Sequence, residues 1–278
     1  MSAPLTQSTI ATITSAGKRQ KMYRARTPAT MRVLPVTVCV AAFTLIGWFG
    51  ATQRAEAQGS TPPPTEEGGM EMPHAFFTHE GLPEGVGSYS LRVAALSTHL
   101  TGQNQGDFAF HLEMGLTKLI GLHIRNDRFL NSDKTEAMFQ FAAITNKSGT
   151  NGFAPIIEFQ FPTHSGASGI TTETGFTTKF TGARYAFNQV LHYSPRENAA
   201  DGSAGLVVKI SDKVFPVVEL LGEGGRNMPT VFNVLAGLKF RVRPWITVGI
   251  ALMLPLTSAR DFASEGVFEP EFVWGKAR

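Results

Sequence analysis

The strongest candidates for chemistry are four titratable side chains that would share one face of a short hairpin. They are His111, Glu113, His123 and Arg125. A three-residue turn at 117–119 would set them opposite one another as two pairs, since facing residues of antiparallel strands come close. Inside a channel, such a cluster could filter solutes or briefly hold a ligand. It could also be a network that keeps enclosed charges paired, and the sequence leaves both interpretations open.

Other expected strands add polar side chains to the same face. The further lumen or constriction candidates are Glu158, Lys239 and Arg241, and Gln140, Gln160, Lys179, Lys209, Glu219, Glu269 and Glu271 share their phase. A charged side chain facing lipid costs roughly 2–4 kcal/mol near the bilayer midplane. An ionisable set confined to one face is therefore what a membrane barrel requires.

A second group of candidate ligands lies before the first expected strand. Met70, Met72, His74 and His79 combine thioethers with imidazoles, which suit a soft or borderline metal such as copper. The alternative is an N-terminal tail in which Phe76 and Phe77 pack against the folded domain.

Other chemistries lack their motifs. The sequence holds no nucleotide-binding loop, no GxSxG, no HExxH and no paired cysteines; Cys39 is its only cysteine. Much of the excess positive charge lies in residues 18–32, before any folded domain, and so does not indicate nucleic-acid binding. The sequence predicts neither an enzyme nor a bound cofactor.

The elements that must position these residues are strands. In residues 231–255 apolar side chains recur at every second position, on both sides of Arg243-Pro244-Trp245. A turn at 243–245 predicts that Val242 faces Ile246, with the pairs Phe240–Val248 and Leu238–Ile250 above it. One face of this hairpin is then apolar and the other is not.

Strand-like segments recur from residue 88 onward, and Gly and Pro interrupt every longer apolar stretch. The expected strands are 88–97, 106–116, 120–128, 135–145, 153–162, 174–186, 190–195, 203–210, 214–222, 231–242, 246–255 and 266–275. Links after odd-numbered strands are mostly the longer ones, as in outer-membrane barrels. The sequence predicts an all-β fold: a single transmembrane antiparallel up-and-down β-barrel of about 12 strands (10–14).

The N-terminal part has the features of an export signal. A basic stretch is followed by an apolar run from Val33 to Phe49 and by Ala55-Glu56-Ala57. We expect an N-terminal extension and secretory signal peptide over 1–57, cleaved after Ala57, with a retained membrane anchor as the alternative. Residues 58–87 would be a disordered linker or N-terminal tail, and 88–278 the barrel.

Several segments resemble one barrel family. Residues 235–249 (LAGLKFRVRPWITVG), 254–262 (LPLTSARDF) and 157–163 (IEFQFPT) are similar to the strands of outer-membrane barrels named for the meta pathway of phenol degradation. The resemblance implies a transporter-like barrel for small hydrophobic or aromatic compounds, and it brings no catalytic residues. The last aromatic residue, Trp274, is followed by four more residues, whereas such barrels usually end on an aromatic.

Together these observations predict a protein of the cell outer membrane that acts as a passive channel or conduit for small solutes. Its expected partners are outer-membrane lipid, a small-molecule solute and the barrel-assembly machinery, with no nucleic acid. Two alternatives stay open. One is a soluble periplasmic β-barrel or sandwich that binds a small apolar ligand. The other is an envelope component of metal handling.

Overall fold

The computed structural model describes residues 72–100, 102–131, 134–163, 169–260 and 262–275, which form twelve long strands and one two-residue strand. The strands are β1 (Tyr89–Leu100), β2 (Gln103–Gly115), β3 (Ile120–Asn126), β4 (Lys134–Phe141), β5 (Ile144–Thr145), β6 (Gly152–Pro162), β7 (Thr171–Thr181), β8 (Tyr185–Ser194), β9 (Ala199–Val208), β10 (Val214–Gly225), β11 (Met228–Arg243), β12 (Ile246–Pro255) and β13 (Ser264–Trp274). No helix among these residues is long and apolar enough to cross a membrane.

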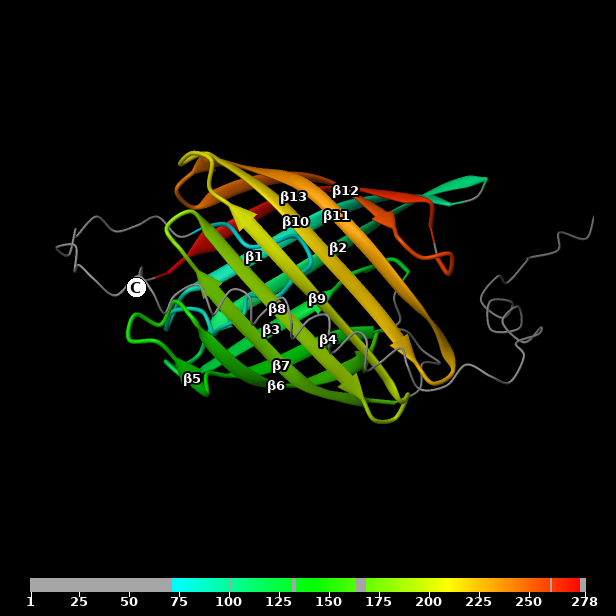
Figure 1. Cartoon of the computed structure of the whole chain (residues 1–278), viewed down its shortest axis with the longest axis horizontal. Helices are drawn as coiled ribbons and strands as arrows, with labels where there is room; N and C mark the ends of the chain where they lie inside the picture. The colour runs from blue at the N-terminus through cyan, green and yellow to red at the C-terminus, as the bar shows by residue number, and fades with distance from the viewer. Residues whose placement is uncertain (1–71, 101, 132–133, 164–168, 261, 276–278) are drawn as a thin grey trace, which may run out of the picture. The chain divides into compact units, whose positions relative to one another are not determined.

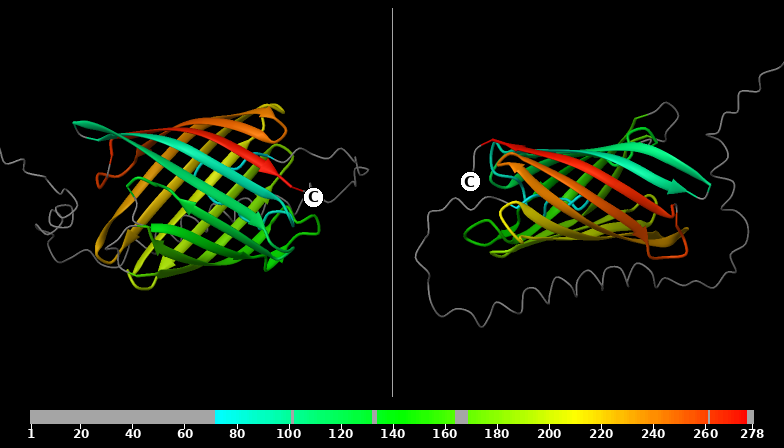
Figure 2. Two further views of the ribbon diagram at one scale, coloured as in Figure 1. Left: turned by 180° about the vertical axis from the view of Figure 1, so that it is seen from behind. Right: turned by 90° about the horizontal axis from the view of Figure 1, so that it is seen from above.

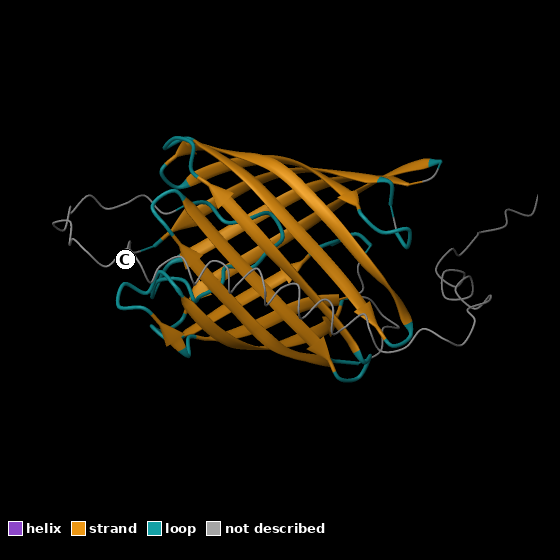
Figure 3. Cartoon of the chain, viewed as in Figure 1, coloured by secondary structure: helices purple, strands orange, loops and turns teal. Residues whose placement is uncertain are grey.

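The strands close into one antiparallel barrel (Figures 1 and 3). Each long strand pairs with its neighbours in sequence, except that β4 pairs with β6 past the short β5. The ring is completed where β1 pairs with β13, with Tyr89 opposite Trp274. Closure satisfies the backbone polar groups of every long strand, which a membrane-spanning sheet must do. The predicted up-and-down barrel of about 12 strands is confirmed.

The two hairpins predicted from sequence have nearly the expected register. Between β2 and β3, Glu113 faces His123 and His111 faces Arg125. Between β11 and β12, Phe240 faces Val248 as predicted. The register shifts between Arg241 and Arg243, so that Arg243 rather than Val242 faces Ile246. This irregularity adds one residue to β11 beside the turn and corrects that part of the prediction.

Both described ends of the barrel wall lie at one rim, which we call the terminal end; the opposite rim is the loop end. The predicted length difference between links is only partly present. At the loop end the links after β3, β6 and β12 are long, but only two residues separate β1 from β2 and β10 from β11. There the strands continue where loops were predicted, and the tip of the β1–β2 hairpin projects at the upper right of Figure 1. The predicted strands 174–186, 190–195 and 203–210 correspond to β7, β8 and β9, displaced by up to five residues.

The two faces of the wall differ as the alternation predicts. The outer face carries exposed apolar side chains, among them Phe240 (40% exposed) and Ile250 (53%). Glu113 and Lys239 point inward and are fully buried. Near the terminal end, the rings of Tyr89 and Trp274 stack with centroids 6.0 Å apart on the outside. Aromatic residues are typical of the level where a barrel meets lipid headgroups.

Residues 72–87, which we call the luminal segment, lie inside the barrel. The segment is the cyan trace enclosed by the strands in Figure 1, and it is also visible between them in the two views of Figure 2. It contains no regular strand. Nearly all of it is buried, and it is the part of the predicted 58–87 linker or tail that the structure describes.

Candidate functional site: the luminal segment and the vestibule

The luminal segment follows the inner wall around the barrel. It starts beside β13, where the backbone amide of His74 donates to Glu271 Oε1 at 3.1 Å. Halfway round it reaches β8, where Gly81 N donates to Asn188 Oδ1 at 3.0 Å. It ends beside β2, where Gly87 N donates to the carbonyl oxygen of Gly115 at 3.0 Å. The segment therefore lines the interior as a partial ring before the chain enters β1.

Charged side chains of the wall bind the backbone of this ring. Glu219 accepts the amides of three consecutive residues, Phe76 at 2.5 Å, Phe77 at 3.0 Å and Thr78 at 2.7 Å. Arg92 donates to the carbonyl oxygens of Ala75 at 2.7 Å and Phe76 at 3.1 Å. A chain without regular structure leaves its amides and carbonyls unpaired, so buried wall charges must satisfy them.

Glycines of the wall make room for the ring. A Cβ on Gly115 would lie 2.1 Å from the carbonyl oxygen of Gly85, and one on Gly249 would lie 2.6 Å from the Phe76 ring. The wall glycines whose added Cβ would touch the luminal segment are Gly115, Gly121, Gly152, Gly205, Gly237 and Gly249. At Gly115, Gly237 and Gly249 the added Cβ would come closer than 3.0 Å to the segment, so these positions require glycine if the segment is to keep its place.

The four side chains of the first predicted cluster all lie at the inner wall, close to the luminal segment. Glu113 is ion-paired with Arg92, and His123 Nδ1 lies 3.7 Å from Glu113 Oε1. His111 Nε2 instead contacts Asp127 Oδ1 at 2.6 Å, and Arg125 is ion-paired with Glu136. The two pairs predicted from the sequence, Glu113–His123 and His111–Arg125, face each other across β2 and β3.

The other lumen candidates are spread around the wall. Lys239 Nζ donates to Glu269 at 2.6 Å, to Glu271 at 3.1 Å and to the carbonyl oxygen of Ala75 at 3.3 Å. The guanidinium of Arg241 lies over the Phe215 ring, 4.7 Å from its centroid. Glu158 Oε2 lies 3.7 Å from His192 Nε2. Lys239, Arg241 and Glu158 therefore contact different partners and do not meet at one constriction.

The predicted methionine–histidine set does not converge on one point. Met70 lies outside the described residues, and Met72 packs against an apolar cluster that includes Phe76. His74 is ion-paired with Glu271, and its Nε2 contacts Glu84 Oε1 at 2.8 Å. His79 instead points to His123, with their Nδ1 atoms 3.2 Å apart.

The two histidines of the luminal segment differ in charge. Burial disfavours the charged form of His74, but the carboxylates of Glu271 and Glu113 outweigh it and raise its pKa to about 10. Burial lowers the pKa of His79 well below its usual value, and the guanidinium of Arg125 lowers it further. At neutral pH His74 is thus an imidazolium held by carboxylates, whereas His79 is a neutral imidazole.

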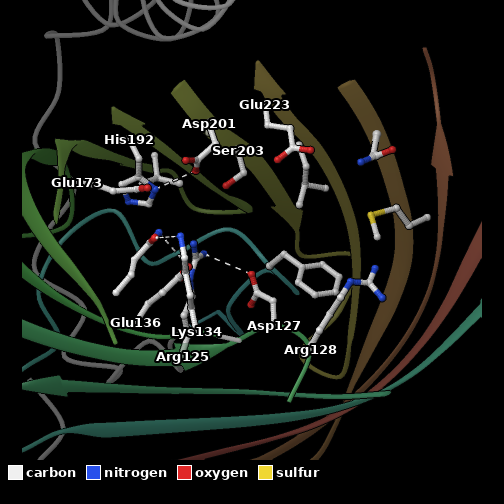
Figure 4. A pocket seen from close by; sticks show the side chains of 18 of the residues that line it. Arg125, Asp127, Arg128, Lys134, Glu136, Glu173, His192, Asp201, Ser203 and Glu223 are labelled. Atoms are coloured by element: carbon white, nitrogen blue, oxygen red, sulfur yellow. Dashed lines mark hydrogen bonds and ion pairs between the residues drawn. The ribbon is translucent and has the colours of Figure 1, made fainter. Parts of the chain in front are cut away.

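A cavity of about 470 Å³, which we call the vestibule, lies at the loop end above the ring (Figure 4). Its lining includes seven carboxylates, three arginine or lysine side chains and one histidine: Asp127, Glu136, Glu173, Glu197, Asp201, Glu223, Glu265, Arg125, Arg128, Lys134 and His192. Apolar side chains, including Phe77, Leu221, Met253 and Phe262, complete the lining. Phe77 belongs to the luminal segment, so the ring forms part of the vestibule floor.

Sequence reasoning missed the role of the ring and of the side chains that hold it. Glu219 and Glu271 were on the predicted ionisable face, but nothing in the sequence showed that their partners are backbone amides and a histidine of residues 74–78. Arg92 was not singled out at all.

No protein-family model and no curated protein matches the sequence. Among solved structures, the chain is similar to an outer membrane channel from Pseudomonas putida F1, with TM-score 0.51 and 9% identity over 70% of this chain and 98% of that chain. The NanC porin gives TM-score 0.48 and 10% identity over 68% of this chain and 99% of that one. At such identities the first likeness shows a shared barrel fold.

Proposed function

We propose that this chain is a non-enzymatic channel of the outer membrane through which small solutes diffuse. The observation that carries the proposal is the placement of charge: a closed barrel has an apolar outer wall and an ionisable interior with a vestibule. An apolar exterior suits hydrocarbon, and a polar lumen suits passage of solutes. The likeness in fold to a solved outer membrane channel supports it.

The same observation disfavours a soluble barrel that binds an apolar ligand. That alternative needs an apolar cavity inside a polar exterior, whereas the described residues have the opposite arrangement. In this proposal the outer face is covered by outer-membrane lipid, and the barrel-assembly machinery inserts the chain after cleavage of the predicted signal peptide.

The vestibule suggests which solutes would pass. Its carboxylates outnumber its basic side chains, so its potential favours cations over anions. Phe77, Leu221 and Phe262 supply an apolar surface beside these charges. We therefore propose small solutes that carry a positive charge on an apolar or aromatic body. The hydrophobic or aromatic compounds implied by the phenol-degradation resemblance are the second candidate, supported by the same apolar side chains.

Planar-bilayer recordings of the mature protein test the channel and its selectivity. We expect discrete conductance steps and a reversal potential that shows a preference for cations under a salt gradient. Replacing two vestibule carboxylates, Asp201→Asn with Glu223→Gln, should weaken that preference. Replacing the exposed turn residue Asp212, as Asp212→Asn, should leave it unchanged. Absence of conductance, or an anion preference, would contradict the proposal.

Liposome swelling addresses the solute class. Aromatic amines, neutral aromatic compounds and aromatic acids of similar size would be compared. Faster entry of the amines supports a cationic solute, and faster entry of the neutral compounds supports the hydrophobic candidate.

A further inference from the structure

Three buried side chains meet where the luminal segment crosses β2 and β3. They are His79 of the segment, Glu113 of β2 and His123 of β3, and one potential ligand atom from each lies within 4.8 Å of the others. Two imidazoles and a carboxylate are a ligand set that zinc and neighbouring divalent transition metals favour.

The hydrogen bonding of these side chains is incomplete. The two imidazoles meet through their Nδ1 atoms, at 3.2 Å. Within the described part of the chain, Nε2 of His79, Nε2 of His123 and Oε2 of Glu113 have no hydrogen-bond partner, although all three residues are at least 98% buried. Buried polar atoms without partners are rare in folded proteins. An ion held by the two Nδ1 atoms would add a partner for the Glu113 carboxylate, whereas the two Nε2 atoms point away from it and would need other partners.

The spacing also fits a metal ion. Two nitrogens bound tetrahedrally to zinc at the usual bond length lie about 3.3 Å apart. The observed separation of the two Nδ1 atoms is 3.2 Å. Oε1 of Glu113 lies 3.7 Å from Nδ1 of His123 and is ion-paired with Arg92, and Oε2 lies 3.6 Å from Nε2 of His74. Binding an ion would therefore replace part of one of these contacts.

Further histidines surround His79. The ring centroid of His111 lies 6.0 Å away and that of His192 lies 6.1 Å away. His111 contacts Asp127 at 2.6 Å and His192 contacts Asp201 at 3.1 Å. His192, Asp127 and Asp201 also line the acidic vestibule, through which a cation can approach.

We propose that His79, His123 and Glu113 bind one divalent transition-metal ion of the zinc class. The ion fastens the luminal segment to β2 and β3 and so holds the ring in place. This site differs from the methionine–histidine set expected from the sequence, because His74 is engaged with carboxylates and Met72 is packed among apolar residues. The proposal does not depend on conduction through the barrel.

Calorimetric titration with zinc chloride tests it on the full mature protein, folded in detergent without a histidine tag and stripped of metal by a chelator. We expect about one zinc ion per chain. His79→Ala and His123→Ala should each weaken binding at least tenfold. His99→Ala is the matched control and should bind as the wild type does, because His99 is exposed and its ring contacts Asn104, away from the three ligands.

Folding and geometry are checked in parallel. Each variant should keep the heat-dependent shift in electrophoretic mobility of a folded barrel. Cobalt as a probe should give the visible absorption of a four-coordinate site in the wild type and lose it in His123→Ala. If a variant does not fold, hydrogen exchange of the wild-type protein tests the proposal instead. Adding zinc should slow the exchange of the backbone amides of residues 76–82. Failure of the wild type to bind zinc stoichiometrically, or unchanged binding by both histidine variants, would overturn the proposal.

Discussion

At the scale of single residues, the luminal segment fits against the wall because several wall positions are glycines, which have no side chain. Gly115 ends β2 beside the last turn of the luminal segment, and a Cβ there would lie 2.1 Å and 2.3 Å from two backbone carbonyl oxygens. Backbone cannot rotate away as a side chain can. The segment or the strand must therefore move when any larger residue is present.

Gly115→Ala should destabilise the segment by about 1–3 kcal/mol, the usual cost of overpacking. Limited proteolysis within residues 72–87 is the measurement, and cleavage should become faster. Gly106→Ala in the same strand is the control, since its Cβ would have only the carbonyl oxygen of Leu96 near it, at 4.0 Å. Equal cleavage rates in the two variants would show that the close approach is not needed.

At the scale of elements, single charged side chains of the wall each bind several atoms of the luminal segment. Glu219 of β10 alone accepts three of its backbone amides and the hydroxyl of Thr78 at 2.8 Å. Hydrogen bonds to charged groups contribute about 1.5–3 kcal/mol each. Removing one carboxylate therefore unpairs a whole stretch of buried backbone.

Glu219→Ala should lower the hydrogen-exchange protection of the amides of residues 76–78 by about 100-fold, because losing even one such bond costs about 1.5–3 kcal/mol. Glu219→Gln keeps one acceptor oxygen and should have an intermediate effect. Asp212→Ala, which removes an exposed carboxylate from a turn, should change nothing. If these amides keep their protection in Glu219→Ala, other contacts hold the segment.

The elements also show what the sequence can and cannot predict. The β11–β12 hairpin was predictable because alternation of apolar residues requires no knowledge of distant partners. The short links between β1 and β2 and between β10 and β11 were not, since polar residues such as Asn104 and Glu223 continue strands there instead of forming loops. The path of residues 72–87 has no periodicity, and its partners come from strands throughout the chain.

The candidate metal site was also predictable only in part. The alternation of apolar and polar residues predicted that Glu113 and His123 point inward and face each other, as they do. The third member, His79, came from a segment expected to be a linker or tail. Only the fold shows that it reaches these two side chains.

At the scale of the whole molecule, the apolar outer wall distinguishes a membrane protein from a soluble one. Ile250 lies in the middle of β12 and is 53% exposed, whereas Ile210 is 68% exposed in a turn at the terminal end. The two isoleucines have similar exposure but different expected depths in a bilayer.

Ile250→Arg should reduce the stability of the barrel in lipid vesicles by roughly 2–4 kcal/mol, and Ile210→Arg by about 0–1 kcal/mol. Urea unfolding from vesicles is the measurement. In a soluble protein both substitutions would place arginine in water and would have similarly small effects. Equal effects would therefore argue against a bilayer around the β12 face.

The position of the luminal segment directly before β1 has a consequence for biogenesis. β1 closes the wall by pairing with β13, and Arg92 of β1 binds the segment that precedes it. Without the luminal segment, Glu219 would lack the backbone amides that it accepts, and Glu271 would lack His74. If β1 pairs last, we expect closure of the barrel and placement of the luminal segment to occur together. A newly inserted barrel would then not expose the membrane to an open lumen that lacks its inner segment.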